Sequence, residues 1–260
     1  MIDAAYVTAG ALTGWVVGLT GVGGGALMTP ILLLVFGVPP TTAVATDLWF
    51  AVITKLVGVG IHGQAGQVDW PVVRRLWMGS LPMALLVVLV IGLGVNVVRV
   101  DWLTQAVGLA VLVTAVGLML APQLLACAQG RQSHARLPIR SRWRSAMTVA
   151  AGALLGLCVA LTSVGAGALG SVVLLYLYPR QMTPHRLVAT DLAHAIPLAG
   201  LAGLGYLLAG EVHGQMLMNL LLGSIPAIGA GSFLARKISG RGIQIALATV
   251  LMGVGLKTLI

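Results

Sequence analysis

Charged residues are scarce in this sequence. They make up 8% of its 260 residues, whereas hydrophobic residues make up 58% and the mean hydropathy is +1.02. This lack of polar surface excludes a soluble domain of such size. Long apolar runs separated by short polar stretches predict an all-α integral membrane protein, because the ten-residue alternation of a membrane β-barrel is absent.

Cysteine is also scarce, because Cys127 and Cys158 are the only two. They are too few for a disulfide framework, and no cluster of His, Cys or Met shows the spacing of metal ligands. A phosphate-binding P-loop of the form GxxxxGK[ST] is missing, so the chain does not hydrolyse ATP itself. We therefore predict a protein that is not an enzyme and that holds no metal or cofactor.

One long phrase is present twice. GALTGWVVGLTGVGGGAL at 10–27 aligns with GALLGLCVALTSVGAGAL at 152–169, and 12 of the 18 positions are identical. The offset then changes from 142 to 144, at which VATD and GSLP in the first half match VATD and GSIP in the second. This duplication predicts two transmembrane repeats, at 1–125 and 145–260, joined by a basic linker at 126–144.

Each repeat contains five apolar segments, of which the second is short. The segments are 4–20, 26–37, 40–62, 71–96 and 100–125, followed by 145–162, 168–178, 185–208, 213–235 and 242–259. At a rise of 1.5 Å per residue, a segment such as 26–37 covers only about 18 Å, less than the hydrocarbon core. The second segment is therefore a half-length or broken helix, and the sequence leaves open whether the first two segments span the membrane or form a re-entrant hairpin.

Basic residues predict the orientation of the repeats. An odd number of passes per repeat gives the inverted topology of secondary transporters. With the linker in the cytoplasm of a bacterial inner membrane, 12 of the 15 Lys and Arg residues fall on that side, which satisfies the positive-inside rule. The net charge of +9 then needs no nucleic-acid partner, since no soluble basic domain is present. Binding of the linker to a partner or to anionic lipid is the alternative.

The glycine-rich phrase lies between the first segment and the short second segment of each repeat. Its glycines break the helix, and the helix that follows offers free N–H groups at the positive end of its dipole. Inversion brings two such ends to the midplane, where they form a site for a small anion, with the hydroxyls of Thr29 and Ser171 nearby. Close packing of helices through small residues is the alternative. The predicted substrate-binding residues are Thr20, Gly23, Gly24, Gly25, Thr162, Ser163, Gly165, Ala166 and Gly167.

Two aspartates lie deep inside apolar segments. Asp47 and Asp191 each end an ATD motif about two turns beyond a proline, too far along to cap their own helices. An ionised carboxylate there is costly unless it is paired or hydrated. Helical spacing puts Lys55 near the face of Asp47, and His194 on the face of Asp191. Either these four residues couple or gate transport, or the acids hold the broken helices through backbone N–H groups and pair with a buried cation.

The combination of these motifs resembles the TauE/SafE family of sulfite exporters. The doubled glycine-rich phrase, the paired ATD motifs and the basic linker between two halves carry the resemblance, from about Gly10 to Gly255. It implies transport of sulfite or of an organosulfonate such as sulfoacetate. Ser163 and Ala166 stand where the first copy has glycine, so the two half-sites differ.

Together these features predict a secondary transporter that exports a small sulfur-containing anion by alternating access. An inside-negative potential favours anion export, so uniport suffices energetically. An anion channel of the same fold is the alternative, distinguished by flux that does not saturate. An intramembrane aspartyl protease is disfavoured, because the two acids are expected at opposite depths and not as one proton-sharing dyad. The predicted partners are the anion and membrane lipid, and a homo-oligomer is compatible with the sequence.

Overall fold

The computed structural model describes residues 2–20, 25–62, 67–92, 100–130, 141–165, 167–178, 181–235 and 240–259. All regular elements in this part of the chain are α-helices, which confirms the predicted fold class. They are α1 (Ala4–Thr20), α2 (Gly25–Leu34), α3 (Pro40–His62), α4 (Trp70–Gly92), α5 (Val100–Gly130), α6 (Ser141–Thr162), α7 (Ala168–Leu177), α8 (Pro184–Leu208), α9 (Gly214–Ala235) and α10 (Gly240–Leu259).

The helix boundaries follow the local sequence signals. α3 and α8 begin at Pro40 and Pro184, where the missing N–H costs nothing because the first N–H groups of a helix have no intrahelical partner. The hydroxyl of Thr183 caps α8 by accepting the N–H of Arg186. The two short helices, α2 and α7, have 10 residues each, so each covers about half of the hydrocarbon core.

The first two helices of each repeat form a hairpin. Tyr6, near the start of α1, stacks on Phe36, just after α2, with 4.4 Å between the ring centroids. The equivalent residues of the second repeat, 142 positions further along, are also in contact, because the hydroxyls of Thr148 and Tyr178 are 2.8 Å apart. Each short helix therefore returns toward the side from which its long partner starts.

Glycines allow the first helix of one repeat to cross the fourth helix of the other at backbone contact distance. A Cβ on Gly223 of α9 would collide with the carbonyl oxygen of Val7 in α1. A Cβ on Gly79 of α4 would collide in the same way with Val149 in α6. These two crossings are equivalent under the repeat, and both use the small-residue packing that is common between membrane helices.

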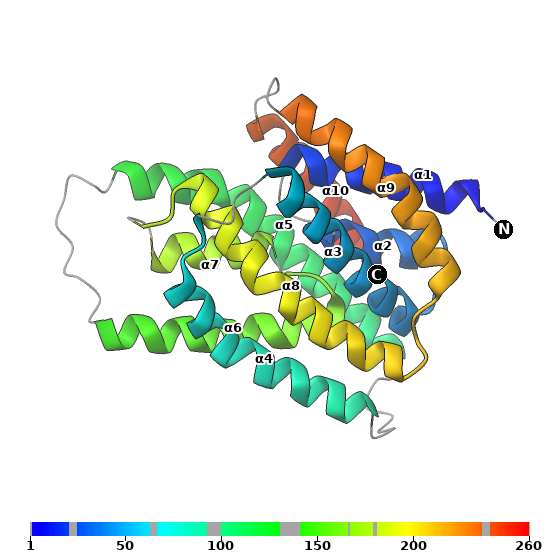
Figure 1. The fold of residues 1–260 in the computed structure, drawn as a ribbon, viewed down its shortest axis with the longest axis horizontal. Coiled ribbons are helices and arrows are strands. Elements are labelled where there is room, and N and C mark those ends of the chain that lie inside the picture. The colour runs from blue at the N-terminus through cyan, green and yellow to red at the C-terminus, as the bar shows by residue number, and fades with distance from the viewer. Residues whose placement is uncertain are drawn as a thin grey trace.

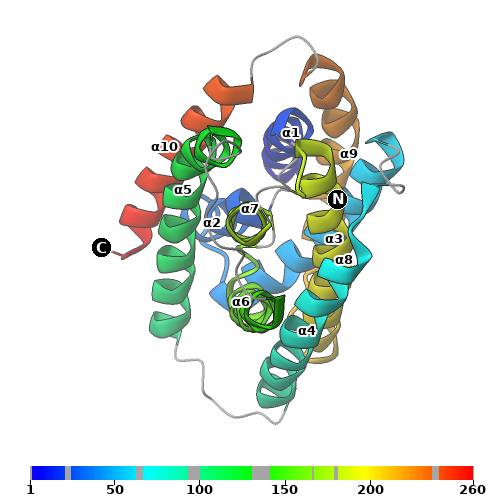
Figure 2. The same ribbon diagram turned by 90° about the vertical axis from the view of Figure 1, so that its left-hand side faces the viewer.

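The helix pairs join the two halves of the chain. α1 packs on α9 and α4 on α6, while α3 packs on α8 and α5 on α10. Figure 1 shows the α1–α9 pair and the α4–α6 pair on opposite sides of the molecule. In Figure 2, α2 and α7 lie inside the bundle, between α5 on one side and α3 and α8 on the other. The repeats therefore interlock, and the broken helices lie at their centre.

The outside of the bundle suits a lipid environment. Within the described residues, α3, α4, α6, α8 and α9 are long and apolar enough to cross a membrane, judged by length and composition. Large apolar side chains are exposed, for example Leu208 at 87%, Phe233 at 67% and Leu154 at 63%. Such exposure is unfavourable in water and expected in contact with acyl chains.

Residues from the loops predicted to be cytoplasmic meet on one side of the bundle. Arg186, in the first turn of α8, forms a 3.6 Å ion pair with Asp69, just before α4. The hydroxyl of Tyr178, just after α7, accepts a hydrogen bond from Arg75 at 3.2 Å, and its ring lies 5.6 Å from the guanidinium carbon of Arg144 in α6. This basic cluster agrees with the grouping of loops that the charge pattern predicts, and its cytoplasmic location stays a prediction.

Candidate substrate and coupling site

Asp47 of α3 holds the short helix α2. The residue is fully buried, at 0% exposed. Its Oδ2 accepts a hydrogen bond from the backbone N–H of Thr29 at 3.2 Å and another from the Thr29 hydroxyl at 2.5 Å. This is the arrangement expected of an acid that clamps a broken helix from a neighbouring one.

The turn between α6 and α7 depends on residues with positive φ. Ser163 has a φ of 58°, Gly165 of 117° and Gly167 of 139°. Such angles favour glycine because a Cβ clashes with the backbone there, so the glycine-rich phrase is what lets the chain reverse into α7. Thr162 is the last residue of α6 before this turn, and its hydroxyl donates a hydrogen bond at 2.6 Å to a carbonyl in the last turn of α6.

Ser163, in the second repeat, lies close to Asp47. The residue is 4% exposed, and its Oγ has no hydrogen-bond partner among the described atoms. The same is true of Oδ1 of Asp47, and the two side chains lie close enough to interact. The middle of α2 and the turn before α7 thus converge on one carboxyl group.

Lys55 interacts with both acids. It is 3% exposed and lies about two turns after Asp47 in α3. Its ammonium group interacts electrostatically with the carboxylate of Asp191 in α8 most strongly, and also with that of Asp47. Both acids therefore interact with one lysine of α3, and α3 packs on α8, while their expected placement at opposite depths stays a prediction.

Asp191 lies against α7, much as Asp47 lies against α2. A Cβ on Gly170 would collide with Oδ1 of Asp191, so glycine leaves the space that this carboxylate occupies. One turn further along α8, Nε2 of His194 is 3.0 Å from the Oγ of Ser80 in α4. Ser80 is not among the site residues predicted from the sequence. It belongs to the GSLP motif that recurs as GSIP, and this recurrence could have indicated it.

The predicted site residues fall into three groups. Those that are buried and linked by hydrogen-bond or electrostatic interactions are Asp47, Lys55, Ser163, Asp191 and His194. Those that form the turn before α7 are Thr162, Gly165 and Gly167. Gly23, Gly24 and Ala166 lie outside the described residues, whereas Thr20 ends α1 and Gly25 begins α2. Among the described residues, no group of three or more His, Cys, Asp or Glu could hold a metal ion.

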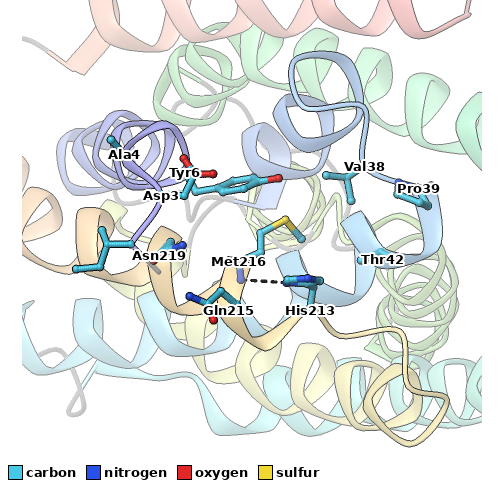
Figure 3. A pocket seen from close by; sticks show the side chains of 11 residues that line it. Asp3, Ala4, Tyr6, Val38, Pro39, Thr42, His213, Gln215, Met216 and Asn219 are labelled. Atoms are coloured by element: carbon cyan, nitrogen blue, oxygen red, sulfur yellow. Dashed lines mark hydrogen bonds between the residues drawn. The ribbon is translucent and has the colours of Figure 1, made fainter.

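A cavity of about 830 Å³ opens near the N-terminus, away from these residues. Figure 3 shows Tyr6, His213 and Met216 around it, with Nδ1 of His213 accepting the N–H of Met216 at 3.2 Å. Thr42, at the start of α3, also lines this cavity, whereas the other end of α3 leads to α4 and the basic cluster. The cavity and the basic cluster therefore mark opposite ends of the bundle.

A helical bundle with an apolar exterior, interlocked halves, two half-length helices and buried charges at its centre defines a membrane transporter. The chain belongs to the sulfite exporter TauE/SafE family, whose family model matches residues 6–258. It is 34% identical over 259 residues to the "Probable membrane transporter protein YjnA" of Bacillus subtilis (strain 168). This alignment covers 98% of this chain and 99% of that protein.

A second relative matches a shorter stretch. The "Probable membrane transporter protein YunE" of the same organism is 36% identical over 73 residues, covering 26% of this chain and 27% of that protein. No solved structure matches the chain. The family and the apolar helices together make this a multi-pass inner-membrane transporter.

Proposed function

We propose that the protein is a secondary transporter that exports a small sulfur-containing anion, sulfite or an organosulfonate, by alternating access. The observation that carries this proposal is the buried Asp47, which accepts hydrogen bonds from Thr29 of α2, lies beside Ser163 before α7 and interacts electrostatically with Lys55. The name of the family supports the class of substrate.

The groups at this centre suit an oxyanion. Lys55 supplies a positive charge, and the hydroxyl of Ser163 supplies a donor. We infer that N–H groups of the two glycine-rich phrases, at 23–25 and 165–167, donate to the oxygens of the anion, since both phrases precede the positive end of a helix dipole. A small tetrahedral or pyramidal oxyanion can accept several such bonds at once.

The packing suggests which parts move. The glycine contacts between α1 and α9, and between α4 and α6, leave no space for sliding within either pair. α2 is connected to the first pair through α1, and α7 to the second through α6. We infer that the two pairs rock against each other, which would open the buried centre first to one membrane face and then to the other.

Labelled sulfite uptake into proteoliposomes tests the proposal. Sulfate, an organosulfonate and chloride serve as competitors, and empty liposomes as the control. We expect saturable sulfite flux that the organosulfonate inhibits. Flux that does not saturate would indicate a channel, and no flux of any of these anions through correctly folded protein would contradict the proposed substrate.

Replacing Ser163 with glycine should weaken anion binding. Glycine adopts the φ of 58° without strain and is the residue at the equivalent position of the first repeat, so the change removes the CH2OH group without straining the backbone. Loss of one hydrogen bond to an anion predicts an increase in the KM for sulfite of about tenfold with little change in thermal stability. Thr258→Ala, which removes a hydroxyl bonded only within α10, is the matched control. An unchanged KM in the Ser163 variant would remove this residue from the site.

A further inference from the structure

The charges at the buried centre do not balance. Two carboxyl groups, those of Asp47 and Asp191, interact electrostatically with one ammonium group, that of Lys55, and all three residues are at most 5% exposed. Fully ionised, the three groups carry a net charge of −1. An anion that enters this centre raises the negative charge further, in a region with little water to screen it. The proposed substrate therefore needs a compensating positive charge.

Lys55 is already engaged by one of the acids. Its strongest electrostatic partner is Asp191, and for Asp191 the lysine is the one charged neighbour identified among the described residues. Asp47 is bound mainly by Thr29 and Ser163, and Lys55 contributes least among its partners. On this division Lys55 compensates the charge of Asp191, and the excess negative charge belongs to Asp47.

The neighbours of Asp47 provide no second cation. In the part of the chain that the structure describes, α2 and α9 carry no ionisable side chain, and α5 contains Asp101 and Cys127 but no lysine, arginine or histidine. α8 contributes Asp191 and His194, and the histidine is bonded to Ser80. A proton is the positive charge that can reach Asp47 without a new side chain.

The carboxyl group of Asp47 has a position ready for that proton. Its Oδ2 is occupied by the two donors of Thr29. Its Oδ1 and the nearby Oγ of Ser163 are both buried without a hydrogen-bond partner among the described atoms. With a proton on Oδ1 the acid can donate to Ser163, and without it the serine hydroxyl can donate to Oδ1, so this pair of atoms can accommodate both states of the acid.

We propose that Asp47 is the proton-coupling site of the transporter, and that one proton bound at its Oδ1 crosses the membrane together with each anion. This inference rests on the proposed function. For a monoanion, proton and substrate bind on one face and leave on the other, so no net charge moves. The gradients of anion and proton then set the direction, and export requires an inside-to-outside ratio of anion that exceeds the outside-to-inside ratio of protons.

Flux of methanesulfonate tests the coupling, since this ion stays a monoanion when the pH changes, whereas sulfite itself takes up protons. In proteoliposomes containing the wild-type protein, we expect a pH gradient to drive accumulation and a potassium–valinomycin potential to have no effect. In Asp47→Asn, the amide replaces the protonated acid. We expect the potential to drive accumulation in this variant and the pH gradient to have no effect. A potential of about 100 mV should then produce up to about 50-fold accumulation, with no response to the pH gradient.

Asp69→Asn is the matched control, since it removes a carboxylate that pairs with Arg186 in the basic cluster. It should keep the wild-type response to the pH gradient. Wild-type flux that follows the potential alone, or an Asp47→Asn variant that still follows the pH gradient, would overturn the proposal.

Infrared spectroscopy separates this proposal from the proposed substrate. A buried protonated carboxyl group gives its own C=O stretching band, which should grow as the pH is lowered. We expect that band in the wild type and in Asp191→Asn, and its loss in Asp47→Asn. Absence of methanesulfonate flux in the wild type would count against the proposed substrate. A missing band, or a band that persists in Asp47→Asn, would overturn the proton site whatever the substrate is.

Discussion

Replacing Gly223 with leucine should prevent the protein from folding stably in the membrane. A Cβ at this position would lie against the carbonyl oxygen of Val7 and 2.8 Å from the N atom of Ala11. Both are backbone atoms, so no rotamer change can relieve the collision and α1 must separate from α9. We expect a loss of more than about 3 kcal/mol in the free energy of unfolding.

The structure offers two matched comparisons for this variant. Gly229 lies in the same helix, and a Cβ there meets nothing within 4 Å, so Gly229→Leu should have the stability of the wild type. Gly79 makes the equivalent crossing in the other half, so Gly79→Leu should fail as Gly223→Leu does. The measurement is the fraction of monodisperse protein in detergent on heating. Equal melting temperatures for Gly223→Leu and Gly229→Leu would show that the tight crossing does not exist.

Local features of the fold could be predicted because their signals are local. Pro40 and Pro184 mark the starts of α3 and α8, and the glycine-rich phrase marks the break before α7. Segment length alone indicated that α2 and α7 are too short to span. These inferences need only the conformational limits of single residues and the thickness of a bilayer.

The composition of the buried centre could not be predicted in the same way. Nothing near Asp47 in the sequence indicates that its partners are Thr29, 18 residues earlier, and Ser163 in the other repeat. Pairing of Lys55 with Asp191 depends on the angle and rotation of α3 against α8, which many side-chain contacts set together. Helical periodicity gives the face of a residue but not the helix that covers that face.

Replacing Lys55 with methionine should be the most damaging change at the buried centre. Methionine keeps the length of the side chain but leaves Asp191 as a buried carboxylate without its cation. Breaking a buried ion pair in this way costs about 3–5 kcal/mol. Lys257→Met, in the exposed last turn of α10, removes the same charge from the surface and should cost less than about 0.5 kcal/mol. The free energies follow from denaturant unfolding of both variants in the same detergent.

The double variant Lys55→Met/Asp191→Asn decides which acid carries the excess charge. If Asp47 holds a proton, removal of the ion pair leaves no uncompensated charge, so the double variant should recover most of the stability lost by Lys55→Met. If Asp47 is ionised instead, the same double variant leaves its carboxylate without a cation and stays destabilised. If Asp47 holds a proton, Lys55→Met/Asp47→Asn should stay destabilised, because Asp191 then remains ionised without a cation. The two double variants therefore measure, without any substrate, whether charge neutrality at this centre is reached through a proton on Asp47.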